Sequence, residues 1–262
     1  MEFRPCIDIH NGQVKQIVGG SLKDQGDLAR ENFVAGKSAE YYARLYQEKG
    51  IKGGHVILLN PASSPYYEAT KAQAMRALAA YPGGLQVGGG INADNALEYL
   101  EAGASHVIVT SYVFQDGHIN TEHLDQICRT VGREHLVLDL SCRIKDGCYY
   151  IVTDRWQKFT EEIVDGHTLD RLMGYCDEFL IHAVDVEGKS QGIEEVLVRQ
   201  LGEWSASPGK IAVTYAGGVH DYKDIELLRA LGGGRIHVTI GSALDLFGGE
   251  LAFDEVLKRT RK

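Results

Sequence analysis

The chain has 262 residues, of which 44% are hydrophobic and 24% are charged, and its formal net charge is −9. These proportions exclude a disordered chain, and the acidic balance argues against a general nucleic-acid-binding protein, which needs a basic surface. No apolar run approaches the roughly 18 residues that a membrane span needs, so we expect no membrane partner.

The cysteines are five in number and contain no Cys-x-x-Cys pair. This pattern disfavours a disulfide framework and a zinc ribbon, and it favours a reducing compartment. An apolar segment begins at Phe3 with no signal peptide before it, which predicts a cytoplasmic protein. A plastid location stays open, because a transit peptide that has been removed leaves no trace.

Short apolar and β-branched runs recur along the chain and are typical of parallel strands buried on both faces. The predicted strands are residues 3–10, 55–60, 85–87, 106–110, 135–140, 178–182, 210–215 and 235–240. Helical patterns lie between them at residues 38–49, 67–80, 93–102, 121–131, 168–175, 193–204 and 222–231, with Asp94 and Asp221 as expected helix starts. This alternation predicts an α/β fold, a (β/α)8 TIM barrel, in preference to a doubly wound open sheet.

An internal repeat relates the two halves of the chain. Three pairs of equivalent positions lie about 130 residues apart: Asp8 with Asp139, Gly90 with Gly218, and Ser111 with Ser242. We therefore expect two similar half-barrels, residues 1–131 and 132–262, in one domain over 1–262, because no linker separates them. Chance similarity between strand–glycine–helix units is the alternative. Two internal halves already close a ring, so we expect a monomer.

Two aspartates stand at the carboxyl ends of predicted strands, inside otherwise apolar runs. Asp8 ends the first strand and Asp139 the fifth, so in a barrel they face each other across the mouth, where active sites lie. Such a pair suits an acid and a base that act on two sides of one substrate. The alternative is a structural role for each, as a loop cap or an ion-pair partner.

Glycine-rich turns follow two strands in repeat register, at residues 88–90 and 217–218. Glycine lets backbone N–H groups approach an anion, and a following helix start favours negative charge. The next strands end in Thr110-Ser111 and Gly241-Ser242, whose hydroxyl and amide groups complete each site. We predict two phosphate sites on opposite sides of the mouth, and hence a small-molecule bis-phosphate substrate. Ordinary βα turns are the alternative reading.

The sequence contains no His-Glu-x-x-His motif and no Cys/His cluster, so we predict no metal. It also lacks a Gly-x-Ser-x-Gly elbow and a Gly-x-Gly-x-x-Gly fingerprint, which disfavours a serine hydrolase and a dinucleotide enzyme. His182 ends the sixth strand, where it either lines the mouth or is a hydrogen-bonded residue of the barrel wall.

Five segments in this order resemble the histidine-biosynthesis isomerase family, in its eukaryotic-type branch, over essentially the whole chain. They are residues 6–14, 87–91, 138–143, 215–218 and 241–249. The resemblance implies a half-barrel repeat, an Amadori rearrangement of the aminoaldose phosphoribosylformimino-aminoimidazole carboxamide ribotide to its aminoketose, and neither metal nor organic cofactor. It also implies roles for individual residues.

By this resemblance Asp139 is the general acid that helps to open the ribose ring, and Asp8 is the base that takes the C2′ proton. Trp156 covers the substrate from a polar loop, where we expect its ring to be exposed; a loop anchor on the barrel rim is the alternative. The implied substrate-binding residues, besides Trp156, are Gly89, Gly90, Thr110, Ser111, Arg143, Asp185, Gly217, Gly218, Gly241 and Ser242.

Two segments depart from the bacterial pattern of this family. The second strand ends in Leu58-Leu-Asn-Pro61 without an acidic residue, and the sixth is followed by Asp185-Val-Glu-Gly, where bacterial members have Asp-Gly-Thr. Either Asp185 or Glu187 is expected to take that acidic role.

Three other functions stay open. The sister cyclase of the same pathway shares the barrel, the aspartate pair and the phosphate sites, but Trp156 and Gly241-Ser-Ala-Leu244 resemble the isomerase. An isomerase that also accepts phosphoribosylanthranilate has the same motifs. A non-catalytic phosphosugar sensor is disfavoured by the intact pair of aspartates.

Overall fold

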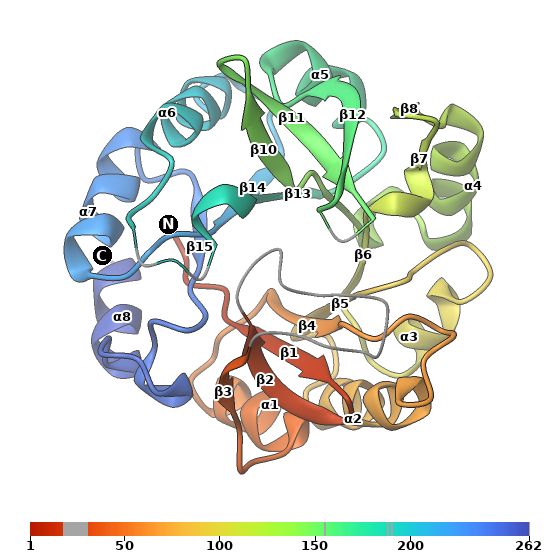
Figure 1. The fold of residues 1–262 in the computed structure, drawn as a ribbon, viewed down its shortest axis with the longest axis vertical. Coiled ribbons are helices and arrows are strands. Elements are labelled where there is room, and N and C mark those ends of the chain that lie inside the picture. The colour runs from red at the N-terminus through yellow and green to blue at the C-terminus, as the bar shows by residue number, and fades with distance from the viewer. Residues whose placement is uncertain (18–30, 155, 188, 190, 262) are drawn as a thin grey trace.

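The computed structural model describes residues 1–17, 31–154, 156–187, 189 and 191–261. Parallel strands form a closed ring, seen end-on in Figure 1. In ring order they are β1 (Cys6–His10), β4 (Gly54–Leu58), β5 (Leu85–Gly88), β6 (His106–Val109), β9 (Leu136–Asp139), β13 (Glu178–His182), β14 (Ala212–Ala216) and β15 (His237–Thr239). This is the predicted (β/α)8 barrel.

The ring closes between the chain's amino-terminal segment and β15. The Arg4 N–H donates to the Val238 carbonyl, and the Val238 N–H donates to the Glu2 carbonyl. The predicted first strand began at residue 3, but β1 begins at Cys6. Pro5 interrupts the ladder because it has no N–H to donate.

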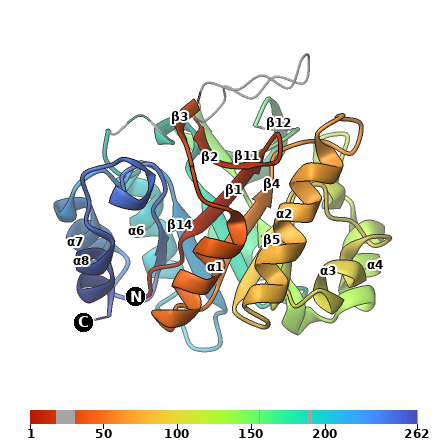
Figure 2. The ribbon, with the colours of Figure 1, turned by 90° about the horizontal axis from the view of Figure 1, so that it is seen from below.

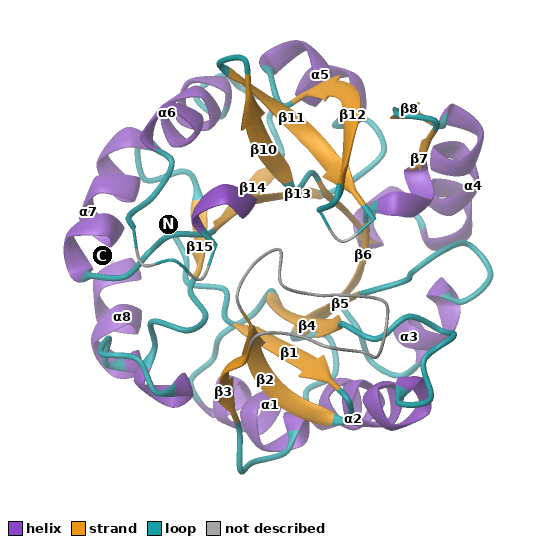
Figure 3. Ribbon diagram, viewed as in Figure 1, coloured by secondary structure: helices purple, strands orange, loops and turns teal. Residues whose placement is uncertain are grey.

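Helices surround the ring and cover its outer face (Figure 3). They are α1 (Ala39–Glu48), α2 (Tyr67–Ala80), α3 (Ala96–Glu101), α4 (Thr121–Val131), α5 (Gly166–Leu172), α6 (Glu195–Trp204), α7 (Tyr222–Leu231) and α8 (Phe253–Thr260). Helix α8 was not predicted, although its buried side chains Phe253, Val256 and Leu257 have helical spacing. Among the described residues no helix is long and apolar enough to cross a membrane.

The two expected helix starts have different outcomes. Asp221 is the N-cap of α7 and forms a capping box with Asp224, which confirms that prediction. The prediction for Asp94 was wrong, because α3 begins at Ala96. The Asn92 side chain accepts from the Asp94 N–H at 2.8 Å and so extends the turn past this residue.

Additional strands, which the sequence analysis did not predict, stand at one end of the barrel. The hairpin β2 (Gln13–Ile17) and β3 (Glu31–Val34) follows β1, the sheet of β10 (Cys142–Lys145), β11 (Cys148–Thr153) and β12 (Lys158–Ile163) follows β9, and β7 (Phe114–Gln115) pairs with β8 (His118–Ile119). Figure 2 shows the two larger excursions at the end opposite the chain termini. Both follow strands that carry a predicted catalytic aspartate.

The barrel interior is filled in layers. Glu178, near the amino-terminal ends of the strands, forms an ion pair with Arg4 and accepts hydrogen bonds from Gln86 and Thr214. Above this polar layer lies an apolar one of Ile57, Ile108, Val137, Leu180 and Ala216. These layers close the barrel from below, so an internal site is accessible only at the carboxyl ends of the strands.

Candidate active site

A cavity of about 950 Å³, its open mouth included, lies at the carboxyl ends of the strands, and Asp8, Asp139 and His182 line it. A more open recess adjoins it beside β5 and β6. Both walls share Ile57, Leu59, Asp139 and Trp156. The two aspartates predicted from opposite halves of the chain therefore meet in one continuous mouth.

Asp8 is half-buried on β1, and its Oδ2 atom accepts a hydrogen bond from Gln16 Nε2 at 3.3 Å. The Cys6 thiol donates to the same oxygen at 3.6 Å. Burial raises the pKa of Asp8 to about 7, and the negative charge of Glu187 adds to this, while Cys6, His182 and Gln16 act against it. Near neutral pH this carboxyl group exchanges protons readily, as a general base must.

Asp139 ends β9, where both of its oxygens accept hydrogen bonds from hydroxyl groups. Ser141 Oγ donates to Oδ1 at 2.7 Å, and Thr110 Oγ1 donates to Oδ2 at 3.2 Å. Burial raises the pKa of Asp139, against the opposing effects of His182 and the two hydroxyl groups. Thr110, which follows β6 and is expected at a phosphate site, therefore also holds the Asp139 carboxylate at the end of the neighbouring strand β9.

Trp156 is half-buried between the cavity and the recess, which corrects the expectation of an exposed ring. Its indole Nε1 donates to Ser141 Oγ at 3.1 Å, and Ser141 in turn donates to Asp139. The ring also meets His182 edge-on, with centroids 4.9 Å apart. Its φ of 67° is unusual for a residue with a side chain, so surrounding contacts must stabilise this conformation.

The two glycine turns have the same backbone form. Gly89 and Gly217 have φ of 104° and 119°, a region that favours glycine. A Cβ atom on Gly217 would lie 2.7 Å from the Ala183 carbonyl oxygen, and one on Gly89 would overlap the Leu58 carbonyl oxygen. Each turn therefore passes against the end of the preceding strand, and a side chain there would push it away.

The predicted phosphate-binding residues lie on two sides of the mouth. Gly89, Gly90, Thr110 and Ser111 line the recess, whereas Gly217, Gly218, Gly241 and Ser242 line the cavity. In Figure 1 β5 and β6 stand across the ring from β14 and β15. Within the described part of the chain, the N–H groups of Gly90, Gly218 and Ser242 donate to no protein acceptor. They are available to an anion.

Gly241 has a second, structural reason to be glycine. A Cβ atom at this position would overlap Gln16 Oε1, the same amide that donates to Asp8. Because Gly241 has no side chain, Gln16 fits beside it and donates its hydrogen bond to Asp8, a predicted catalytic residue.

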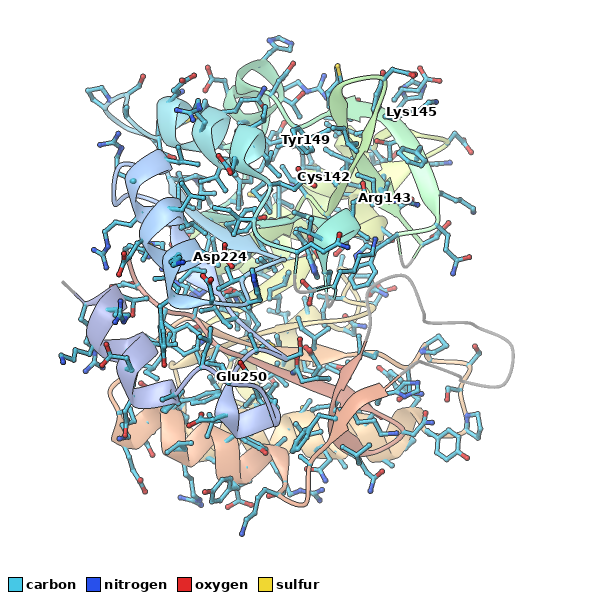
Figure 4. All side chains as sticks on the ribbon, turned by 60° about the vertical axis from the view of Figure 1, so that its left-hand side comes forward. Cys142, Arg143, Lys145, Tyr149, Asp224 and Glu250 are labelled. Atoms are coloured by element: carbon cyan, nitrogen blue, oxygen red, sulfur yellow. The ribbon has the colours of Figure 1, made fainter. Side chains whose placement is uncertain are left out.

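Arg143 and Asp185 are brought together, but outside the walls of the cavity and the recess. Arg143 Nε lies 2.9 Å from Asp185 Oδ1, and its guanidinium lies over the Phe159 ring at 5.4 Å. Asp185 also accepts the Ile144 N–H at 2.9 Å. Figure 4 shows Arg143 on the sheet of β10 to β12. In this arrangement the pair fastens the segment after β13 to that sheet.

Of the two acidic residues after β13, Glu187 is the one that lines the cavity. Its Oε2 lies 3.1 Å from His182 Nε2. His182, whose place the sequence left open, also lines the cavity. Burial lowers the pKa of His182, but the charges of Glu187, Asp139 and Asp8 outweigh this effect and raise it above the usual value.

Sequence reasoning did not single out Ser141 and Gln16. Ser141 follows Asp139 by two residues, a spacing that could have indicated a nearby partner. Gln16 reaches Asp8 only because β2 folds back onto β1. Among the described residues, no three His, Cys, Asp or Glu side chains group in a way that could hold a metal ion.

Comparison with known proteins places the chain among its relatives. The model of a family described as histidine biosynthesis protein matches residues 2–251. The chain belongs to this family. A relative from Medicago truncatula, described as chloroplastic, is 55% identical over 261 residues, which cover 98% of this chain and 81% of the relative.

Fungal relatives are similar over nearly their full lengths. One from Yarrowia lipolytica is 46% identical over 95% of this chain and 93% of its own, and one from Saccharomyces cerevisiae is 42% identical over 95% and 94%. All three relatives carry the name 1-(5-phosphoribosyl)-5-((5-phosphoribosylamino)methylideneamino)imidazole-4-carboxamide isomerase.

Proposed function

We propose that this chain catalyses the isomerisation for which its relatives are named, as an enzyme of histidine biosynthesis. The substrate is an aminoaldose with a phosphate at each end, and the product is the corresponding aminoketose. The observation that carries this proposal is the pair Asp8 and Asp139, facing one cavity between two glycine turns. The names of the relatives support the same reaction.

Backbone amides hold the two phosphates in this proposal. Gly90 and Ser111 bind one phosphate in the recess, and Gly218 and Ser242 bind the other in the cavity. The N–H groups of Gly90, Gly218 and Ser242, which have no acceptor among the residues that the structure describes, support the assignment. The second site follows β14 and β15, the seventh and eighth barrel strands, where TIM barrels frequently bind phosphate. Amide donors let an acidic protein hold two dianions without a basic surface.

The proton transfers balance with the two aspartates alone. Protonated Asp139 donates to the ribose ring oxygen as the bond from this oxygen to C1′ breaks, which leaves a Schiff base. Ionised Asp8 removes the C2′ proton, and the electron pair forms an enaminol. Asp8 then returns its proton to C1′, the 2′-hydroxyl proton passes to Asp139, and the 2′-ketone forms. Both carboxyl groups regain their starting states.

The environment of both aspartates supports a part in proton transfer, while the division into acid and base is the one that the family resemblance implies. Burial raises the pKa of Asp139, which favours the proton that an acid must carry. Asp8, with a pKa of about 7, is ionised in part of the molecules at neutral pH and still binds a proton strongly enough to remove one from carbon.

Trp156 covers the substrate and stacks on the planar aminoimidazole carboxamide. Its place between the two phosphate sites supports this role. The bond from its indole to Ser141 links the position of the ring to that of Asp139. A bound substrate that rests on the indole is thereby aligned with the acid.

The proposal also covers the domain organisation, oligomeric state, cofactors and cellular location of this enzyme. We propose one domain over residues 1–262 that works as a monomer, without metal, organic cofactor, nucleic acid or membrane, in the cytoplasm or a plastid. The ring closes within the chain through Val238, which supports a monomer. Five unpaired cysteines support a reducing compartment.

A spectrophotometric assay with the aminoaldose, with and without ammonia, tests the proposed function. We expect conversion to the aminoketose at the same rate in both conditions. Turnover of the aminoketose that needs ammonia would instead identify the sister cyclase. Binding of the aminoaldose with no turnover would identify a phosphosugar sensor, and either result would refute the proposal.

A further inference from the structure

Gln16 contacts Asp8, although the proposed mechanism gives this glutamine no task. It stands on β2, which pairs antiparallel with β1, the strand that carries Asp8. Its amide Nε2 donates to Asp8 Oδ2 at 3.3 Å and to the sulfur of Cys6 at 3.6 Å. Only 3% of Gln16 is exposed. A buried amide is thus directed at the carboxylate that the mechanism uses as its base.

The two oxygens of the Asp8 carboxylate differ in their contacts. Oδ2 accepts hydrogen bonds from the Gln16 amide and the Cys6 thiol. Oδ1 accepts none from the residues that the structure describes, and Asp8 lines the cavity. At Asp139, by contrast, each oxygen accepts a hydrogen bond from a hydroxyl group. Asp8 therefore has one oxygen occupied by donors and one that is open to a substrate.

The hairpin of β1 and β2 determines where Gln16 lies. Its two-residue turn consists of Asn11 and Gly12, with φ of 51° and 74°, as a tight hairpin turn requires. Asn60 Oδ1 accepts the Asn11 N–H at 2.7 Å. The Thr70 hydroxyl accepts the Gly12 N–H at 3.0 Å. The register is thereby fixed, and a slip of one residue would turn Gln16 to the opposite face of the hairpin.

Two further features adjust the position of the Gln16 amide. The pairing of β2 with β3 shifts register between Gln16 and Ile17, and such bulges re-aim a side chain beside an active site. On the other side of the amide lies Gly241, where a Cβ atom would overlap Gln16 Oε1. A backbone irregularity and a glycine from a distant strand end therefore both bear on one amide group.

We propose, on the basis of the proposed function, that Gln16 is a positioning residue whose amide holds Asp8 Oδ2, so that Oδ1 is the atom that takes the C2′ proton. Gln16 acts through Asp8 and transfers no proton itself. The same Oδ1 atom then returns the proton to C1′, so the balance of the proposed reaction is unchanged. The hydrogen bond also favours the ionised carboxylate and lowers the pKa of Asp8, against the effect of burial.

Steady-state kinetics of Gln16→Met, which removes the donor and keeps a side chain of similar size, test the proposal. We expect kcat to fall about tenfold, as for the loss of one hydrogen bond to a charged group, with little change in KM. The acidic limb of kcat/KM against pH should move to higher pH, because the base loses a bond that favours its ionised form. Gln13→Met, on an exposed position of the same strand, is the matched control and should change neither.

A double variant with Asp8→Asn shows whether Gln16 acts through Asp8. Once the carboxylate is gone, the amide has no base to position, so Gln16→Met should lower the kcat of Asp8→Asn no further. A further tenfold loss in the double variant would overturn the proposal, because Gln16 would then have an effect that does not depend on Asp8. Wild-type kcat in Gln16→Met alone would overturn it as well.

Gly241→Ala tests the same contact without a change in Gln16. Its Cβ atom displaces the amide from Asp8, so we expect kcat to fall. In Gln16→Ala there is no amide to displace, and Gly241→Ala should then leave kcat unchanged. Any loss of phosphate binding at Gly241 is measured separately, in KM. An equal loss of kcat from Gly241→Ala in both backgrounds would overturn the proposal.

A measurement without substrate separates this proposal from the proposed function. Carbon-13 NMR of the carboxyl groups, with Asp8 identified by its absence in Asp8→Asn, reports the pKa of Asp8 directly. We expect this pKa to be higher in Gln16→Met than in the wild type, and unchanged in Gln13→Met. An unchanged pKa in Gln16→Met overturns the positioning role even in an active enzyme. A wild type that titrates as expected without turnover of the aminoaldose refutes the isomerase alone.

Discussion

Glu178 and Asp8 are carboxylates inside the same barrel, one near its amino-terminal end and the other at its mouth. Burial opposes ionisation of both. At Glu178 the positive charge of Arg4 and the hydrogen bonds from Thr214 and Gln86 overcome it, and the pKa falls below its usual value. At Asp8 no cation of the described residues is in contact, burial and the charge of Glu187 oppose ionisation, and the pKa rises to about 7.

This contrast teaches that partners, and not burial, decide whether an internal carboxylate is structural or reactive. A paired carboxylate stays ionised and anchors its neighbours, whereas one without a contacting cation can gain and lose a proton near neutral pH. The barrel keeps the first type at its closed end and the second at its open end. Variants that remove either kind of carboxylate, or a residue that contacts it, test this division.

Asp8→Asn and Asp139→Asn should each lower kcat by about 10²–10⁴-fold, because each removes a group that transfers a proton. Asparagine keeps the shape of the side chain, so KM should change little. Steady-state kinetics with the aminoaldose measure both constants. Near-wild-type turnover in one variant would show that its aspartate does not transfer a proton in the reaction. Near-wild-type turnover in both variants would refute the proposed mechanism.

Arg4→Met should destabilise the fold by about 3–5 kcal/mol, because it leaves the Glu178 charge buried without its partner. Unfolding in urea, followed by circular dichroism, measures the loss. The control is Lys49→Met, which breaks an exposed pair with Asp254 and should cost less than about 1 kcal/mol. Equal losses in the two variants would contradict the structural role given to Glu178.

Trp156→Ala should lower kcat/KM by about tenfold to a hundredfold, since stacking on a base is worth roughly 1–3 kcal/mol. Trp156→Phe keeps a ring but loses the hydrogen bond to Ser141, so it separates stacking from alignment of Asp139. Thermal unfolding should change little in both. A variant that unfolds, or that turns over substrate normally, would make Trp156 a loop anchor.

The smallest expected effect concerns stability and pH. Between the unfolded pKa near 4 and the folded pKa of about 7, the folded state binds more protons at Asp8 than the unfolded state does. Its contribution to stability is therefore present below pH 4 and is lost as pH rises through 7. Asp8→Asn should gain about 1 kcal/mol over the wild type at pH 8, a typical size for one stabilising change.

Thermal unfolding at pH 4 and pH 8 measures this difference, and Glu178→Gln provides the opposite case. Its folded pKa is lowered, so the wild-type residue stabilises at pH 8, and Glu178→Gln should destabilise there. A gain for Asp8→Asn that is equal at both pH values would show that the carboxylate proton is not its source.

Sequence patterns located the barrel strands well, because parallel strands buried on two faces leave continuous apolar runs such as 136–139 and 178–182. The hairpins that complete the mouth were not located. Strands such as β10 and β12 are short and partly exposed, and they carry charged residues between apolar ones. Polar segments of this kind have the sequence pattern of loops, and they form strands because a neighbouring strand pairs with them.

By itself, the sequence determined the barrel, the placement of Asp8 and Asp139 at its mouth, and the two glycine turns. These features follow from local patterns and from a repeat, which need no knowledge of distant contacts. Only the tertiary structure decided that Glu187 and not Asp185 reaches the cavity, that Trp156 bonds to Ser141, and that Gln16 holds Asp8. The direction of a side chain after a turn depends on which segments pack beside it, and those segments lie far apart along the chain.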